Sequence, residues 1–298
     1  MEARLIADLN VTRYLDLMKI RLIFVLVAMT TLSFGQRLIV RGDDMGYSHS
    51  GNLALIKCSK EGIQTSIEII VPSPWFPEAV KFLKENPNID VGIHLALTSE
   101  WDNVKWRPLT DCPSLRTPDG YFYPMVNPNA NYPKMSIKEN AWKIEDVEKE
   151  LRAQIETALK DLPGRISHLS AHMGCTWLSD ETRALEAKLA KEYKIDIFDM
   201  SLKDLGVTYA PFDGPHATKE EKISSFIKML AKLEKGKTYL FVEHPGFDNE
   251  ELRAISHIGY ENVAADRQGV TDLYTSEEVK AEIKKKGIQL VSYKDLRR

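Results

Sequence analysis

Apolar, β-prone runs alternate with helical patterns from residue 36 onward, and this alternation constrains the fold more than any other feature of the chain. The runs that predict strands are 38–41, 66–71, 89–97, 166–171, 195–198, 238–242 and 288–292. The patterns that predict helices are 52–61, 77–86, 144–162, 179–193, 219–233 and 276–286. Strands separated by helices favour a parallel sheet. We therefore predict an α/β fold, a (β/α) barrel of the TIM-barrel type with about seven strands. An open doubly wound sheet is the alternative.

One segment, 99–140, is too long for an ordinary connection and carries aromatic residues among several prolines. The aromatics are Trp101, Trp106, Tyr121, Phe122, Tyr123 and Tyr132. At the mouth of a barrel they could stack on sugar rings, or they could pack the loop onto the barrel. The length of 298 residues suits one domain over 36–298 with this loop as an insertion.

Charge and cysteine usage narrow the class of protein. The formal net charge is −3, whereas nucleic-acid binders usually carry a basic stripe, so we expect no nucleic-acid partner. Cys58, Cys112 and Cys175 form no paired framework, which leaves either one disulfide or buried free thiols. A homodimer is compatible with the sequence, which does not fix the oligomeric state.

Residues 18–35 have the outline of a secretory signal peptide. Lys19 and Arg21 make its start basic, and an apolar run follows over 20–29. Ser33 and Gly35 are small residues placed just before the cleavage position. The run is short for a membrane span, which needs roughly 20 apolar residues. We predict that 1–17 is an upstream extension and that the mature protein begins near Gln36, is secreted or periplasmic, and has no stable membrane span. An uncleaved anchor and a buried helix are the alternatives.

Four predicted strands end in residues that bind metals or transfer protons. They are Asp43 with Asp44, His94, His172 and His244. In α/β barrels the chemistry lies at the C-terminal ends of strands, and Asp and His are ligands of divalent metals. Together these residues predict a metallohydrolase. Singly, each also fits a structural role, because Asp favours turns and a buried His needs only a hydrogen-bond partner.

Asp43 and Asp44 are adjacent, so a regular strand would point them to opposite faces. A turn at Gly42 or Gly46 could let both side chains reach one cavity. One carboxylate could then hold a cation while the other takes a proton from water.

The histidines are not equivalent. His168 and His172 share a face of a strand, but at roughly 3.3 Å per residue they stand about 13 Å apart and cannot hold one ion if both are extended. His172 is the better ligand, and His168 is predicted to be structural. His244, next to Glu243, is a candidate general acid, with a metal ligand or a packed residue as alternatives. The residues predicted to lie in loops or at the surface are His49, His216 and His257.

These residues resemble the motifs of the YdjC-like carbohydrate deacetylases, the ChbG family. Residues 41–46 (RGDDMG) resemble the ADDFG motif of the family, and residues 92–98 (GIHLALT) resemble its G-x-H-L-x-L-T motif. Residues 167–172 (SHLSAH) resemble its T-H-x-D-S-H motif, and residues 243–246 (EHPG) resemble its HPG motif. The order agrees over 37–298. Ser170 and Gly42 depart from the common Asp and the frequent Ala, and 173–176 lack the His pattern of many members.

The resemblance implies a (β/α) barrel of the glycoside hydrolase and deacetylase type, related to the polysaccharide deacetylases. It implies hydrolysis of an N-acetyl group on an acetylated amino sugar or oligosaccharide. Carried over by motif position, Asp44, His94 and His172 would hold one divalent ion, with Mg²⁺ and Zn²⁺ as the expected ions. Asp43 would be the general base, and His244 is the candidate general acid.

Two other functions remain open from the residues. One is a different barrel metallohydrolase that acts on an ester or a phosphate, although the charge balance does not indicate phosphate. The other is an exported sugar-binding protein without catalysis, against which the intact set of Asp43, Asp44, His94 and His172 argues.

Overall fold

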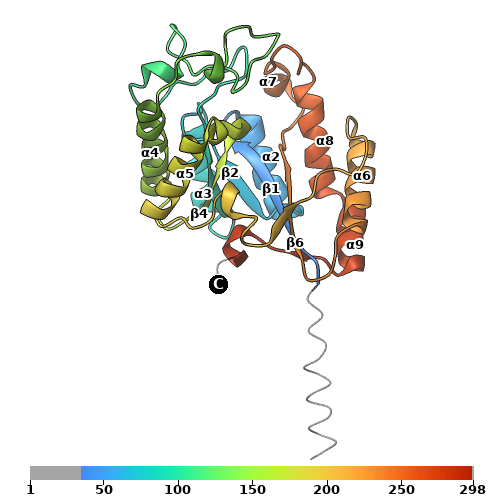
Figure 1. Ribbon diagram of the computed structural model, residues 1–298. Coiled ribbons are helices and arrows are strands. Elements are labelled where there is room, and N and C mark those ends of the chain that lie inside the picture. Colours follow the sequence, from blue (N-terminus) through green and yellow to red (C-terminus); the bar gives the residue numbers. More distant parts are fainter. Residues whose placement is uncertain (1–34, 297–298) are drawn as a thin grey trace, which may run out of the picture. The chain divides into compact units, whose positions relative to one another are not determined.

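The computed structural model describes residues 35–296 (Figure 1). The predicted extension and, apart from Gly35, the predicted signal peptide lie outside these residues. From Gln36 on the chain forms one compact unit.

The core of this unit is a seven-stranded sheet in which every pairing is parallel. Its strands are β1 (Arg37–Met45), β2 (Ser66–Ile69), β3 (Asp90–Leu95), β4 (Ile166–Ala171), β5 (Val207–Tyr209), β6 (Thr238–Glu243) and β7 (Gln289–Leu290). The order is β4-β3-β2-β1-β6-β5, and β7 pairs with the start of β1. The apolar runs of β1 and β3 are buried on both faces, as expected of strands in a parallel sheet covered by helices.

The sheet is a curled half-barrel, and the closed barrel that we predicted is not seen. Within residues 35–296 no ladder joins the two edge strands, β4 and β5. The run 195–198 was predicted to be a strand, but it makes only an isolated parallel bridge between Phe198 and Leu169 of β4. The chain turns at once into the 3₁₀ helix η4 (Asp199–Ser201), which ends the pairing. The edge position beside β6 is taken by the three-residue β5, which is too short to give a sequence signal.

Helices surround the sheet, and most lie where they were predicted (Figure 1). They are α2 (His49–Glu61), α3 (Phe76–Glu85), α4 (Ile144–Asp161), α5 (Asp180–Glu192), α6 (Lys219–Ala231), α7 (Glu250–Arg253), α8 (Val263–Thr275) and α9 (Glu277–Lys286). The sequence did not predict α7 and α8. The first has only four residues, and the second carries Gly269 and several polar residues, which weaken a helical pattern.

The long segment between β3 and α4 lies above the C-terminal ends of the strands, at the top in Figure 1. It contains the 3₁₀ helices η1 (Pro113–Leu115) and η2 (Ile137–Glu139). Glu150 of α4 accepts hydrogen bonds from the backbone N–H groups of Leu109 and Thr110, which ties the segment to the helix. Trp106 and Phe122 are buried in the main core cluster, so they pack the loop onto the sheet.

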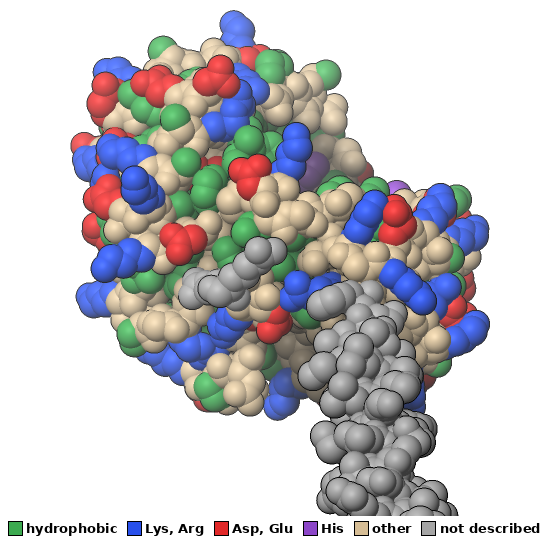
Figure 2. Space-filling model, turned by 60° about the horizontal axis from the view of Figure 1, so that its bottom comes forward, with side chains coloured by type: hydrophobic (Ala, Val, Ile, Leu, Met, Phe, Trp, Pro, Cys, Tyr) green, Lys and Arg blue, Asp and Glu red, His purple; other side chains and the backbone are tan. Residues whose placement is uncertain are grey.

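Several other expectations can be compared with the described residues. Cys58, Cys112 and Cys175 are buried free thiols, not a disulfide. No helix within 35–296 has the length and apolar character needed to cross a bilayer. On the face shown in Figure 2, Lys and Arg side chains are interspersed with Asp and Glu and form no continuous basic stripe.

Candidate metal centre

The carboxylates of Asp43 and Asp44 reach the same pocket because β1 is irregular where they lie. The pairing of β1 with β2 shifts register here, as at a β-bulge. Asp44 has a φ of 71°, the left-handed conformation that Asp tolerates better than most residues. Consequently Oδ2 of Asp43 and Oδ1 of Asp44 each lie 3.6 Å from Nε2 of His94. The expected turn is at Gly46, which has a φ of 111°, and the backbone N–H of Tyr47 closes it by donating to the carbonyl of Asp44 at 3.3 Å.

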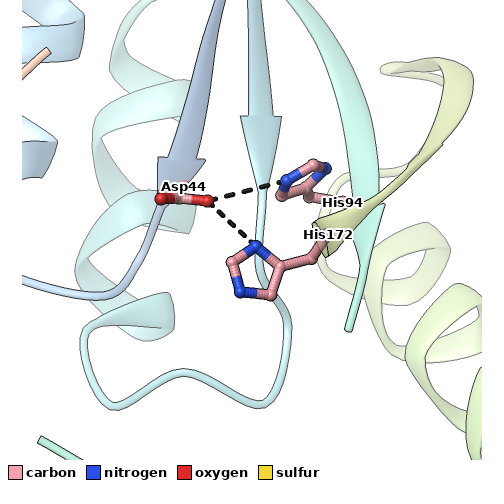
Figure 3. A group of neighbouring side chains, drawn as sticks. All are labelled: Asp44, His94 and His172. Atoms are coloured by element: carbon pink, nitrogen blue, oxygen red, sulfur yellow. Dashed lines mark ion pairs between the residues drawn. The ribbon is translucent and has the colours of Figure 1, made fainter. Parts of the chain in front are cut away.

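Asp44, His94 and His172 form a buried group whose potential ligand atoms all lie within 4.8 Å of one another. Figure 3 shows the carboxylate of Asp44 facing both imidazoles. Oδ1 of Asp44 lies 3.2 Å from Nδ1 of His172 and 3.6 Å from Nε2 of His94. The three residues come from β1, from β3 and from the first position after β4. The fold therefore brings together three side chains that were predicted as ligands.

In each imidazole, the ring nitrogen that points away from Asp44 (the far nitrogen) faces a hydrogen-bond acceptor. Nδ1 of His94 lies 2.7 Å from Oγ of Ser170, whose hydroxyl donates to Oε2 of Glu68 at 2.6 Å. Nε2 of His172 lies 3.0 Å from Oε2 of Glu100. A proton on each far nitrogen leaves the near nitrogen with a lone pair, which is what a metal ligand needs.

Two buried arginines hold the two carboxylates. Nη2 of Arg41 donates to Oδ2 of Asp43 at 2.9 Å. Nη2 of Arg267 donates to Oδ2 of Asp44 at 2.8 Å, and its guanidinium lies 4.5 Å from the ring centre of Tyr47. Because Arg267 occupies Oδ2, Oδ1 of Asp44 is left facing the imidazoles.

His244 closes the other side of the pocket from the end of β6. Its Nε2 lies 4.0 Å from Oδ2 of Asp44, and its Nδ1 lies 3.7 Å from Oε2 of Glu243. The side chain is 39% exposed, whereas those of His94 and His172 are 3% and 5% exposed. Burial lowers the pKa of His244, but Asp44 and Glu243 raise it to a net value above the ordinary one. An exposed imidazole that keeps its proton can donate it to a molecule in the pocket.

The two adjacent carboxylates differ in how readily they take up a proton. Burial raises the pKa of Asp43 to about 6, against the lowering effect of Arg41 and His244. Burial also acts to raise the pKa of Asp44, but the positive charges of His244 and Arg267 hold it well below its usual range. Asp44 therefore stays ionised as a ligand should, and Asp43 can exchange a proton near neutral pH.

The two imidazoles also differ. Burial, and then the charge of His172, hold the pKa of His94 well below its usual range, so this ring is neutral. For His172 burial acts in the same direction, but Glu100 and Asp44 raise the pKa to about 10. The cationic ring of His172 thus supplies the positive charge that the surrounding carboxylates require.

The group fits a divalent cation. Oδ1 of Asp44 is buried and accepts no hydrogen bond, whereas buried polar atoms normally have partners. A carboxylate with two imidazoles suits zinc and several other divalent ions. A cation beside Asp44, His94 and His172 would take the place of the proton on Nδ1 of His172.

These residues line a pocket of about 480 Å³. Its walls are Asp43, Asp44, His94, Glu100, Trp101, Ala171, His172, Met173, Gly174, His244, His257, Tyr260 and Arg267. Trp101 lies beside His257 and Tyr260, with ring centres 5.6 Å and 6.0 Å away, and forms an aromatic wall with them. His257 lies in a loop and is partly exposed, as predicted, but its ring also lines the pocket, which the sequence did not indicate. His49 pairs with Glu78 away from the pocket.

His168 has no part in the pocket, in agreement with its predicted structural role. It is fully buried, its Nε2 bonds Oε1 of Glu68, and its ring stacks on Tyr293 with a centroid separation of 3.5 Å.

Four charged residues of the site were not predicted. Glu68 and Arg41 are charged residues in apolar strands. A charged residue in such a strand needs a buried partner, and this pattern could have indicated that both lie near the site. Glu100 lies two residues after the motif 92–98, at the start of the long loop. Arg267 lies on α8, which gave no helical signal, so nothing local pointed to it.

Comparisons with known proteins identify the family of this chain and several similar proteins. The YdjC-like protein family matches residues 37–285. A carbohydrate deacetylase of Thermus thermophilus is 32% identical over 239 residues, which cover 73% of this chain and 80% of the relative. A carbohydrate deacetylase of Geobacillus stearothermophilus is 26% identical over 263 residues, covering 86% and 96%. The crystal structure of a putative cellobiose-phosphate cleavage protein from Enterococcus faecalis superposes with a TM-score of 0.68 at 23% identity, covering 88% of this chain and 99% of that one.

Proposed function

This chain belongs to the YdjC-like protein family, and on that premise we propose that it is a hydrolase that removes the N-acetyl group from an acetylated amino sugar or oligosaccharide. The family expected from the sequence motifs is confirmed by the match over residues 37–285. Relatives named carbohydrate deacetylase support the reaction class.

One observation carries the proposal. A carboxylate and two imidazoles converge within 4.8 Å, and a second carboxylate, that of Asp43, lies 3.6 Å from one of the imidazoles. Amide hydrolysis needs both an electrophilic centre and a base beside it. We assign Asp44, His94 and His172 as the ligands of one divalent ion, with Mg²⁺ and Zn²⁺ as the expected ions.

Asp43 is the proposed general base. When bound, the ion supplies Lewis acidity, which favours attack of water on a carbonyl carbon. Arg41 holds Oδ2 of Asp43 through a 2.9 Å hydrogen bond and so fixes the carboxylate at the pocket. Asp43 takes the proton of the attacking water.

His244 is the proposed general acid. It faces the pocket from β6, across from the His94 side, and its imidazole is the most exposed of the histidines near Asp44. Its protonated Nε2 delivers a proton to the departing amine, while Glu243 orients the ring at Nδ1.

The aromatic wall of Trp101, His257 and Tyr260 offers apolar faces to a sugar ring. The catalytic unit is residues 36–298, with the 99–140 segment as its insertion. We further propose that the protein acts outside the cytoplasm, as a secreted or periplasmic enzyme, from the signal-peptide pattern at 18–35. No nucleic-acid partner is proposed, and a homodimer remains a prediction.

The test is acetate release from a panel of N-acetylated sugars by the metal-loaded protein from Gln36 onward, with Asp43→Asn as the matched control. The variant keeps the ligands but loses the base, so acetate should appear with the wild type and fall at least about 100-fold with the variant. Metal content is measured in both proteins. Metal bound without acetate from any sugar would favour an ester or phosphate substrate or a sugar-binding role. Full activity of Asp43→Asn would remove the base assignment.

A further inference from the structure

We propose that Glu100 is a positioning residue of the metal centre: it fixes His172 in the tautomer that carries a proton on Nε2 and presents Nδ1 to the ion. The inference rests on the proposed metal site and adds a residue outside the three ligands.

The geometry separates the two nitrogens of His172. Nδ1 lies 3.2 Å from Oδ1 of Asp44, and Nε2 lies 3.0 Å from Oε2 of Glu100. Within residues 35–296, the group of ligand atoms that lie within 4.8 Å of one another holds Asp44, His94 and His172 and does not include Glu100. Glu100 therefore acts through the imidazole. A carboxylate that accepts the second N–H of a metal-bound histidine fixes its tautomer and orientation.

Burial makes this contact specific. Glu100 and His172 are 5% and 4% exposed, so water cannot easily replace either partner. The loop that carries Glu100 is anchored at the preceding residue, because Oγ of Ser99 accepts a hydrogen bond from the backbone N–H of Trp106 and its carbonyl accepts one from Nζ of Lys105. The carboxylate is thus held in place before any ion binds.

His94, the other imidazole ligand, presents the other ring nitrogen to the metal site. Nδ1 of His94 contacts Oγ of Ser170, whose hydroxyl donates a hydrogen bond to Glu68, and Nε2 of His94 faces Asp44. One ligand thus presents Nδ1 and the other Nε2. In each case the acceptor on the far side of the ring, Glu100 or Ser170, determines which nitrogen is presented.

The experiment measures Zn²⁺ affinity by competition with a chelator. The proteins are the wild type, Glu100→Leu, Glu100→Gln and a control, Glu78→Gln. Glu100→Leu should bind Zn²⁺ about 10- to 100-fold more weakly. Glu100→Gln keeps an oxygen that can accept a hydrogen bond from Nε2, so its Zn²⁺ affinity should lie between those of Glu100→Leu and the wild type. It also tests the inference if the leucine variant does not fold. Glu78→Gln removes a carboxylate that contacts an imidazole outside the pocket, that of His49, and should keep the wild-type affinity.

Imidazole NMR of the zinc-loaded proteins gives a second readout, which a purely structural role would not change. The wild type should show a protected Nε2–H proton for His172, assigned by its absence in His172→Asn, and Glu100→Leu should lose that protection. Wild-type affinity and an unchanged His172 signal in Glu100→Leu would overturn this inference alone. Failure of the wild type to bind Zn²⁺ or any other divalent ion would overturn the metal site, and this inference with it.

Discussion

Two clusters of carboxylates and imidazoles lie next to each other in the same sheet, and they differ in what they can bind. The metal cluster is Asp44, His94 and His172, and the buried pair is Glu68 and His168. Ser170 connects them, because it contacts Nδ1 of His94 and donates to Glu68.

The buried pair is closed. The ring of His168 stacks on Tyr293, its Nδ1 lies 2.7 Å from Oγ of Ser167, and its Nε2 meets Glu68. Gly92 makes room for the pair, because a Cβ at this position would overlap both Glu68 and His168. The metal cluster instead opens into a pocket of about 480 Å³ and leaves Oδ1 of Asp44 without a hydrogen bond.

Residue type alone therefore does not distinguish a ligand from a structural residue. Both clusters contain carboxylate oxygens and imidazole nitrogens, but in the metal cluster Oδ1 of Asp44 has no hydrogen-bond partner and faces a pocket, whereas both nitrogens of His168 are hydrogen-bonded. A buried polar atom without such a partner is costly, and that cost favours binding of an ion.

The largest expected effect is in the metal cluster, from His172→Ala. The change removes one of three ligands, so bound metal and acetate release should both fall below detection. Metal analysis after dialysis and the unfolding midpoint in a chelator are the measurements. The metal-free variant should unfold at a lower midpoint than the metal-free wild type, because buried Glu100 loses its cationic partner. Retained stoichiometric metal would place the ion elsewhere.

A smaller loss is expected from His244→Asn, which alters the exposed imidazole of the pocket. Loss of a general acid lowers kcat by about 10²- to 10⁴-fold, whereas the three ligands remain. Steady-state kinetics with parallel metal analysis separate the two roles. If the variant loses its metal together with its activity, His244 is a ligand and not the acid.

Much of this comparison was visible in the sequence. The strand ends at Asp44, His94 and His172 follow from the β-prone runs before them, and parallel strands bring their C-terminal ends to one edge of the sheet. The distance along β4 also separated His168 from His172. These patterns are local in the sequence, and the fold brings the side chains of Asp44, His94 and His172 together.

What the sequence did not show depends on contacts between distant segments. Arg267 reaches Asp44 across 223 positions of the chain, and Glu100 reaches His172 across 72. The openness of the sheet depends on whether β4 meets β5, which neither strand encodes by itself. The conformation of Asp44, with a φ of 71°, also has no signal beyond the Asp itself.

In the buried pair, His168→Ala should cost about 3–5 kcal/mol of unfolding free energy, because it leaves Glu68 as an unpaired buried charge. Burial acts to raise the pKa of Glu68, but His168 lowers it to about 2. A lowered carboxylate pKa stabilises the fold above the ordinary value of 4.5, and this contribution is lost as the pH falls toward 2. Urea unfolding should therefore show a large difference between variant and wild type at pH 7 and a smaller one at pH 3.

Zinc affinity provides the control for that variant. The folded His168→Ala protein should keep most of its affinity, unlike His172→Ala, because the effect reaches His94 only through Glu68 and Ser170. Equal loss of metal in both variants would show that the two clusters act as one.

The smallest effect concerns Glu186 of α5, a buried carboxyl without an imidazole partner. Burial, with Asp199 adding to it, raises its pKa to about 8, the opposite of Glu68 with its His168. One oxygen accepts from Oγ1 of Thr176 at 2.9 Å, and the other has no hydrogen-bond partner. A raised carboxylate pKa means that the folded state holds its proton while the unfolded chain releases it, so stability falls as the pH rises from about 4.5 to about 8. Glu186→Gln should be more stable than the wild type at pH 9 and as stable as the wild type at pH 4. Chemical denaturation at the two pH values measures this, and a gain that is the same at both would mean that the carboxyl does not titrate in this range.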